Sequence, residues 1–223
     1  MCGRYNLITD AQAFIDAFQV INRLDWQPRY NIAPSQAVPA IRQEEDGRKA
    51  VLLRWGLIPH WAKDEKFGYR TINARAETVD TKPAYRAAFN RRRCLIPATG
   101  FYEWRQMQGY KQPYNIRLKD QQVFAFAGLW ERWQSPEGKA VESCTIIVTE
   151  VNEDVKSIHD RMPVILKPDD YGVWLDPGMQ DTSPLKALLK PYPADRMDYW
   201  PVNRRVGSPA NDDPALIEPL DPR

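Results

Sequence analysis

The sequence predicts one α+β domain, built mainly of antiparallel strands in a meander or barrel-like arrangement with short helices at its periphery. Residues 94–149 contain five apolar or alternating segments separated by short turns, which is typical of sequential antiparallel strands. The 19 prolines and 8 tryptophans among 223 residues favour many short elements over long helices. No repeat, low-complexity tract or linker divides the chain, so residues 1–223 are predicted to form a single domain. The extension from about residue 217 receives no assignment.

The first predicted element is an amphipathic helix over residues 10–21. Thr9 and Gln12 form a capping-box pattern at its start. Apolar side chains then recur at helical spacing, and we expect them in the core: Phe14, Phe18 and Ile21.

A β-hairpin is predicted next, after an irregular, proline-containing stretch over residues 26–35. Its strands are residues 37–42 and 50–55. The polar turn between them contains Asp46-Gly47, a strong hairpin signal. Residues 56–72 are predicted to be a loop.

The second half is predicted to alternate strands, turns and short helices. A short helix over residues 83–90 ends at the basic run 91–93. The predicted strands are residues 94–97, 101–106, 114–118, 123–133, 144–149, 163–166 and 199–202. The predicted turns are residues 108–109, 119–120 and 135–138. Further helices are predicted at residues 152–159, 168–174 and 184–190, the last two because a proline stands at the first helical position.

Composition excludes several classes of protein. The formal charge of +2 is too small to indicate nucleic-acid binding by bulk charge, so phosphate contacts would need a local cluster. No apolar run reaches the roughly 18 residues of a membrane span, and no secretory signal opens the chain. Three cysteines without CxxC spacing predict reduced thiols, no disulfide framework and no zinc site. We therefore expect a cytoplasmic monomer without metal or cofactor.

Cys2 has chemistry that no internal cysteine shares. Removal of Met1 would give it an amine and a thiol on adjacent carbons, with reference pKa values of roughly 8 and roughly 8.5. Such a pair condenses with an aldehyde to an imine, and the thiol then closes a five-membered thiazolidine ring. The alternative is that Cys2 belongs to a frayed terminus.

Glu103 and His159 are candidates for proton transfer. Glu103 lies in a predicted strand between two aromatic residues, and an inward orientation would raise its pKa. The alternative places it on the solvated face of the strand. His159 follows a predicted helix and titrates near physiological pH, although a cation favoured by the helix dipole is the alternative. His60 has no identifiable partner.

Polar and aromatic side chains could hold DNA. Asn73 and Arg75 would share one side of an extended segment, where they could bind a phosphate or sugar. Other arginines that could line a groove are Arg4, Arg70, Arg91, Arg92, Arg93 and Arg161, and the aromatics that could stack on bases are Trp61, Tyr102 and Trp104. The alternatives are a solvated charged patch and ordinary core aromatics.

Eight segments, in order and over nearly the whole chain, resemble the SRAP (SOS response-associated peptidase) domain family, in particular its bacterial group. They are Cys2-Gly3-Arg4-Tyr5, Tyr30-Asn31-Ile32-Ala33-Pro34, Trp55-Gly56-Leu57-Ile58-Pro59, Asn73-Ala74-Arg75-Ala76-Glu77-Thr78, Arg93-Cys94-Leu95-Ile96-Pro97, Gly100-Phe101-Tyr102-Glu103-Trp104, His159-Asp160-Arg161-Met162-Pro163 and Pro201-Val202-Asn203.

The resemblance implies the SRAP fold and a DNA-damage function linked to the SOS response. Its partner would be single-stranded DNA containing abasic sites, which it would sense and capture as a covalent thiazolidine cross-link, with an accompanying lyase activity. By the same resemblance, Cys2 would be the nucleophile, Asn73 would position it, Glu103 would move protons and His159 would protonate the sugar oxygen. The residues implied in DNA binding are Arg4, Trp61, Arg75, Trp104 and Arg161.

Two other functions stay open at this point. A cysteine with histidine, glutamate and asparagine also permits a thiol peptidase, acting on its own N-terminus or on other chains. The third possibility is a non-covalent module for single-stranded DNA in which Cys2 is incidental.

Overall fold

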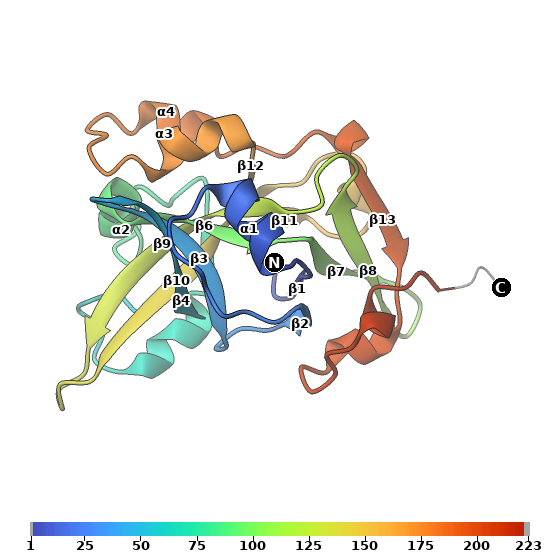
Figure 1. Cartoon of the computed structure of the whole chain (residues 1–223). Helices are drawn as coiled ribbons and strands as arrows, with labels where there is room; N and C mark the ends of the chain where they lie inside the picture. Colours follow the sequence, from blue (N-terminus) through green and yellow to red (C-terminus); the bar gives the residue numbers. More distant parts are fainter. Residues whose placement is uncertain (1, 221–223) are drawn as a thin grey trace.

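Two β-sheets form the body of the molecule. The computed structural model describes residues 2–220. The first sheet is antiparallel throughout and has the strand order β13-β8-β7-β1-β2 (Figure 1). Its strands are β1 (Tyr5–Leu7), β2 (Arg29–Ile32), β7 (Gly100–Gln106), β8 (Lys111–Leu118) and β13 (Met197–Pro201).

The second sheet closes into a barrel. Its order is β11-β10-β4-β3-β6-β9-β12, and β9 also pairs with β10, so β10, β4, β3, β6 and β9 form a closed ring of five strands. The strands of this sheet are β3 (Ala37–Glu44), β4 (Gly47–Trp55), β5 (Asn73–Arg75), β6 (Arg93–Ala98), β9 (Phe124–Gln134), β10 (Ala140–Glu150), β11 (Arg161–Pro163) and β12 (Ile165–Leu166). Closure removes unpaired edges from those five strands.

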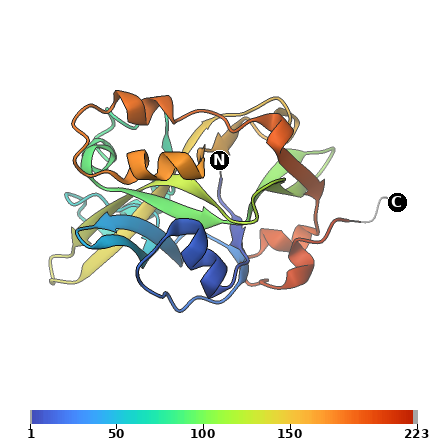
Figure 2. The ribbon, with the colours of Figure 1, turned by 45° about the horizontal axis from the view of Figure 1, so that its top comes forward.

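The helices are short and lie at the periphery of the strands, as Figure 2 shows. They are α1 (Ala11–Phe18), α2 (Arg86–Arg91), α3 (Tyr171–Leu175) and α4 (Ser183–Ala187). The 3₁₀ helices are η1 (Glu65–Arg70), η2 (Val155–Ser157), η3 (Pro168–Asp170), η4 (Ala194–Arg196), η5 (Arg204–Gly207) and η6 (Pro214–Leu216). Within residues 2–220, no helix has the length and apolar character needed to cross a bilayer.

The predicted α+β class, with antiparallel strands, a barrel and peripheral helices, is confirmed, but a simple meander is wrong. The pairs β3–β4, β7–β8 and β9–β10 are hairpins, whereas β6 and β7 belong to different sheets. Strand β10 also pairs in parallel with β4 and β5. These parallel pairings join segments about 70 to 90 residues apart along the chain, which short turn signals cannot reveal.

Several predicted boundaries need correction. Helix α1 is capped by Asp10, whose side chain accepts the backbone N–H of Ala13, and not by a Thr9–Gln12 box. The helix ends at Phe18, because the following Gln19 has a left-handed φ of 53°. Ile21 therefore lies beyond the helix and is 54% exposed. The predicted irregular stretch 26–35 contains β2, the predicted loop 56–72 contains η1, and the predicted helix 152–159 is only η2. Strand β1 was not predicted.

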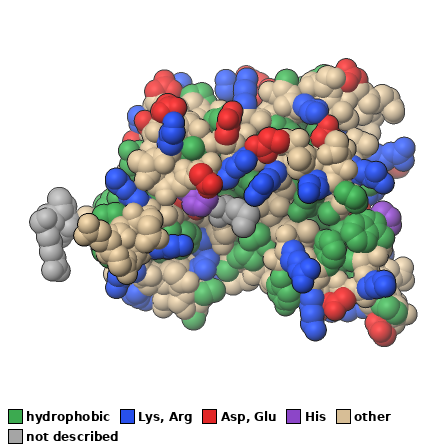
Figure 3. All heavy atoms as spheres, turned by 180° about the vertical axis from the view of Figure 1, so that it is seen from behind, with side chains coloured by type: hydrophobic (Ala, Val, Ile, Leu, Met, Phe, Trp, Pro, Cys, Tyr) green, Lys and Arg blue, Asp and Glu red, His purple; other side chains and the backbone are tan. Residues whose placement is uncertain are grey.

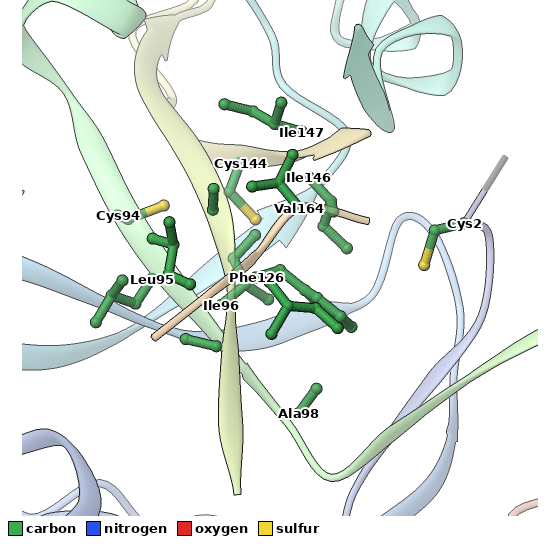
Figure 4. Close-up of a cluster of buried hydrophobic side chains, with 14 of the residues drawn as sticks. Cys2, Cys94, Leu95, Ile96, Ala98, Phe126, Cys144, Ile146, Ile147 and Val164 are labelled. Atoms are coloured by element: carbon green, nitrogen blue, oxygen red, sulfur yellow. The ribbon is translucent and has the colours of Figure 1, made fainter. Parts of the chain in front are cut away.

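One hydrophobic core joins the two sheets. The ring of Phe126 on β9 contacts Tyr5 on β1 and Phe101 on β7 edge to face, with ring centroids 5.7 Å and 6.0 Å apart. Cys94 and Cys144 are buried in the barrel part of this core (Figure 4). The β1/β7 edge of the first sheet is thereby fixed against the barrel.

The C-terminal extension packs against the first sheet. The indole N–H of Trp200 on β13 donates to the carbonyl of Ile217 at 2.8 Å, and the N–H of Leu220 donates to Pro201 O at 2.9 Å. Leu216 is buried against Tyr102. The extension from residue 217 therefore continues the domain through residue 220; residues 221–223 lie outside the described part.

Candidate active site

The N-terminal segment runs alongside β7. Tyr5 pairs with Phe101, and the N–H of Tyr102 donates to the carbonyl of Arg4 at 3.0 Å. Continuing this antiparallel register brings Cys2 toward Glu103 and the strand residues after it. Cys2 is 0% exposed, which excludes a frayed position for this residue. Figure 4 shows it well apart from Cys94 and Cys144.

The Cys2 thiol is held in its protonated form. Burial raises the pKa of this thiol far above its usual value, and the charge of Glu103 raises it further. A hydrogen bond with the backbone of Arg4 acts in the opposite direction but is a smaller cause. Sulfur chemistry at this position therefore needs a base that takes the thiol proton.

Glu103 has the properties of such a base. Its side chain points inward and the residue is only 2% exposed, which confirms the inward orientation over the solvated one. Burial, assisted by the charge of Asp160, raises the pKa of Glu103 from 4.5 to about 7. A carboxyl group with this pKa can both accept and return a proton near neutral pH.

His159 extends the site away from Glu103. Its Nε2 lies 3.8 Å from Glu103 Oε2. Its Nδ1 accepts the backbone N–H of Arg161 at 3.1 Å and also lies 2.9 Å from Asp160 Oδ1. An unprotonated Nδ1 can only accept, so the contact with Arg161 belongs to the neutral ring and the contact with Asp160 to the protonated ring.

The neutral ring is the favoured form. Burial lowers the pKa of His159, although the charge of Asp160 partly opposes this. Neutral His159 then carries its proton on Nε2, the atom that faces Glu103. This argues against a helix-terminal cation, and it gives Glu103 a neighbour able to exchange a proton.

Asn73 and Arg75 share one side of β5, as their spacing predicts. Ala74 between them is fully buried in the core. The backbone of Asn73 is held by the hydroxyl of Tyr85, which donates to Asn73 O at 3.0 Å. Among the described residues, buried Asn73 Oδ1 has no hydrogen-bond donor, and Nδ2 is 3.5 Å from Ile146 O. The amide can therefore turn its acceptor toward a ligand.

Strand β10 brings β5 close to β11 and so to the neighbourhood of His159. Val148 on β10 pairs with Arg75 of β5 on one side and with Pro163 of β11 on the other. An ion pair between Arg161 and Glu77 links the two segments directly. Asp160 and Glu77 thus belong to the site, and neither was singled out from the sequence, because only the fold shows which charges they face.

The predicted DNA-binding arginines differ in their surroundings. Arg75 is exposed and Arg161 is bound to Glu77. The guanidinium of Arg4 donates to Asn31 Oδ1 at 2.9 Å and to the carbonyl of Val206 at 2.6 Å, so it ties the N-terminal segment to η5. Lys and Arg side chains are spread over the face drawn in Figure 3. The phosphate-binding roles stay predictions.

Arg93 does not belong to a charged groove. It is buried, and its guanidinium donates to the carbonyls of Phe89, Trp174 and Asp176. The interpretation of residues 91–93 as one solvated basic patch is therefore wrong for this residue. Arg91 is exposed, and Arg92 pairs with Glu131 at 2.6 Å.

The three aromatic residues predicted to stack on bases also differ in their exposure. Trp61 is 48% exposed and contacts Phe67 edge to face, beside a hollow that Lys63, Lys66 and Arg70 help to line. Trp104 is half-buried. Tyr102 is fully buried and its hydroxyl donates to Tyr30 O at 2.7 Å, so stacking by Tyr102 is excluded.

The cysteine, glutamate and histidine meet where the first sheet joins the barrel, and β5 and β11 lie beside them. No group of three or more His, Cys, Asp or Glu side chains within residues 2–220 is arranged to hold a metal ion. The arrangement offers a buried thiol, a carboxyl group of near-neutral pKa and a neutral imidazole. Together these can carry out condensation and proton transfer.

Comparisons with known proteins give the family of the chain. The sequence model described as SOS response associated peptidase (SRAP) matches residues 1–209. The abasic site processing protein YoqW of Bacillus subtilis is 46% identical over 222 residues, covering 98% of this chain and 99% of that protein. The abasic site processing protein HMCES of Gallus gallus is 32% identical, and the match covers 88% of this chain and 67% of that protein. A crystal structure of a protein from Bacteroides thetaiotaomicron has a TM-score of 0.87 at 28% identity, over 98% of this chain and 100% of that one.

Proposed function

The chain belongs to the SOS response associated peptidase (SRAP) family, and we propose that it captures abasic sites in single-stranded DNA as a covalent thiazolidine cross-link. The names of its relatives support abasic-site processing as the general activity. Cross-linking through Cys2 is the specific form of it that the chemistry of the site favours.

The reaction needs the amine and thiol of Cys2 after removal of Met1. The amine adds to the C1′ aldehyde of the ring-opened sugar, and loss of one water gives an imine. The sulfur then bonds to the imine carbon, and its proton moves to the nitrogen. The sum is aldehyde plus aminothiol giving thiazolidine and water, without any oxidant or metal.

The observation that carries the proposal is the position and pKa of Glu103. The amine must be neutral to attack, the departing hydroxyl needs a proton, and the thiol must lose one. Glu103, with a pKa of about 7 and charge coupling to the Cys2 thiol, is suited to all three transfers. This one carboxyl group can act alternately as base and acid because its two protonation states lie close in free energy.

The other side chains take supporting roles in the proposal. Neutral His159 donates its Nε2 proton to the sugar oxygen, which aids ring opening and the β-elimination of a lyase reaction. Asn73 Oδ1 accepts a hydrogen bond from the opened sugar or the amine. Arg75, Arg161 and Arg4 hold the flanking phosphates, with Arg161 exchanging Glu77 for phosphate. Trp61 and Trp104 stack on neighbouring bases.

The protonated thiol makes a peptidase the less favoured function. Thiol peptidases use a cysteine whose pKa is lowered by a histidine cation or a helix terminus. Here burial and Glu103 both raise the pKa of Cys2, and burial keeps His159 neutral. In the proposed reaction the amine attacks first, so a protonated thiol is no obstacle.

A denaturing gel with single-stranded DNA carrying one abasic site tests the proposal. Intact mass first establishes that Met1 is absent. We expect a heat-stable shifted band with the native protein and with Cys94→Ala, which removes an equally buried thiol, and no such band with Cys2→Ala. A band that persists undiminished in Cys2→Ala would refute the thiazolidine, and a complex released by high salt alone would indicate simple binding.

Glu103→Gln in the same assay tests the proposed base. The amide keeps the shape of the carboxyl group but cannot exchange a proton. We expect cross-linking to slow by about 10²-fold, the usual lower range for general acid–base catalysis. An unchanged rate would remove Glu103 from the mechanism while leaving the cross-link itself intact.

A further inference from the structure

A second polar hollow lies on the other side of the first sheet. Along β7, Phe101 and Glu103 face the core side, while Tyr102 between them packs with the C-terminal residues. The same alternation puts Asn6, Asn115 and Arg117 on the outer face. The sheet therefore separates this hollow from Glu103.

The hollow has the size of a small-ligand site, about 340 Å³. Its polar lining residues are Asn6, Thr99, Asn115, Arg117, Lys119, Gln121 and Gln122. Trp200 and Ile217 form a wall, joined by the hydrogen bond from the Trp200 indole to Ile217 O. Ile217 lies beyond residues 1–209, so the C-terminal segment, red in Figure 1 and lying near β8 and β13, contributes a part that the family match does not include.

The floor of the hollow depends on Gly100. A Cβ at this position would lie 2.8 Å from Asn115 Oδ1 and 3.1 Å from the amide of Asn6. Asn6 and Asn115 are both buried, and Asn6 Nδ2 donates to Asn115 Oδ1 at 3.0 Å. The absence of a side chain at Gly100 thus leaves a floor made of two fixed carboxamides.

Several polar groups around the floor still have bonding capacity. Asn115 Nδ2 donates to no other described residue, and buried Gln121 Oε1 accepts from none in residues 2–220. The guanidinium of Arg117 lies 4.8 Å from the Trp200 ring and forms no ion pair with a described carboxylate. Lys119 donates to Asp195 O at 2.9 Å and is 4.0 Å from Asp198. No carboxylate lines the hollow itself.

We propose that this hollow binds a nucleoside monophosphate, either free or as the phosphorylated end of a DNA strand. Arg117 near the end of β8 and Lys119 just after the strand present cations to the phosphate. Carboxamides bind the donor and acceptor atoms of base edges, and Asn115 and Gln121 supply an amide donor and an amide acceptor to the lining. The proposal does not rest on the cross-linking function.

The test is titration of the full-length protein with deoxynucleoside monophosphates, followed by NMR chemical shifts and calorimetry. Arg117→Gln should weaken binding at least tenfold, and Gln121→Glu should weaken it through charge repulsion even if Arg117→Gln alters the position of Trp200. Arg132→Gln, the same charge change at an exposed position of β9, should bind within twofold of the native protein. Cross-linking of abasic DNA should stay within twofold in all three variants.

Each of the remaining outcomes either supports or overturns the proposal. Binding of a 5′-phosphorylated oligonucleotide, but not its 5′-hydroxyl form, would identify the strand end as the source when free nucleotides fail. No saturable binding of either ligand, or equal affinity in Arg117→Gln, would overturn the site. Inorganic phosphate binding as tightly as the nucleotides would overturn base recognition, and loss of binding in Glu103→Gln would place the ligand at the active site instead.

Discussion

Glu103 is the residue whose chemistry depends most on its surroundings. The strand pattern allows it to face either water or the core, and the side chain is the same in both cases. The structure places it on the Phe101 side of β7, beside Cys2 and within 3.8 Å of His159. Desolvation then raises the pKa of this carboxyl group from 4.5 to about 7.

The raised pKa of Glu103 predicts a specific dependence of stability on pH. The folded protein binds this proton more tightly than the unfolded chain, so the stabilising contribution is complete below pH 4.5 and is lost as the pH rises toward 7. Glu103→Gln should therefore be more stable than the native protein at pH 8, by on the order of 2 kcal/mol, and the advantage should shrink toward pH 5.

Urea denaturation at the two pH values, on the same N-terminal form of each protein, measures this difference. Glu137→Gln makes the same chemical change in an exposed turn and should leave the unfolding free energy unchanged at both pH values. A stability difference for Glu103→Gln that is equal at pH 5 and pH 8 would show that Glu103 is not buried as a titrating group.

Arg93 shows how an element is held by one side chain. It begins β6, and its guanidinium donates to Phe89 O in α2, to Trp174 O in α3 and to Asp176 O just after α3. Carbonyls in the last turn of a helix have no partner within the helix. One buried cation thus satisfies the ends of two short helices and fixes both to the barrel.

Replacing neighbouring arginines separates this structural role from surface charge. Arg93→Ala leaves three carbonyls without their donor and should lower the free energy of unfolding by about 2–4 kcal/mol. Arg91→Ala removes the same charge from an exposed position and should change it by no more than about 0.5 kcal/mol. Thermal and urea unfolding measure both. Equal losses of unfolding free energy in the two variants would mean that residues 91–93 act together as one surface patch.

The short elements show which local signals can be trusted. The hairpin turn within residues 43–49 was predicted from Asp46-Gly47, and Gly47, the first residue of β4, indeed has a φ of 140° and pairs with Glu44 at the end of β3. The start of α1 was predicted one residue early, because Thr9 and Asp10 are both good capping residues and only the backbone geometry selects Asp10. Strand β5 has three residues, too few for any periodic signal.

At the scale of the whole molecule, the C-terminal segment, residues 204–217, covers the β2 edge of the first sheet. Asp212 Oδ1 accepts the backbone N–H groups of Tyr30 and Asn31 in β2, at 2.6 Å and 3.0 Å. The side-chain amide of Asn31 donates in turn to three carbonyls of the segment, including Asn211 O at 2.7 Å. An edge strand that would otherwise expose donors is thereby covered.

Asp212→Ala should loosen this attachment. Two backbone donors lose their acceptor, so we expect a loss of about 1–3 kcal/mol in unfolding free energy. Faster hydrogen exchange should appear in β2 and in residues 204–217. Asp213→Ala removes a neighbouring carboxylate whose only described partner is Arg205, at 2.9 Å, and should cost less than about 1 kcal/mol. Slow exchange in β2 of Asp212→Ala would show that the segment is not what holds that edge.

The sequence by itself determined the α+β class, most strands of the second half and the family, because turn residues, alternation and ordered motifs are local properties of the chain. It also identified Cys2, Asn73, Glu103 and His159 as candidates. Only the tertiary structure decided that Glu103 faces Cys2 and His159, that Asp160 and Glu77 join them, and that Tyr102 and Arg93 are buried. Desolvation, charge coupling and strand closure depend on contacts between segments 50 to 150 residues apart, and no local pattern encodes those distances.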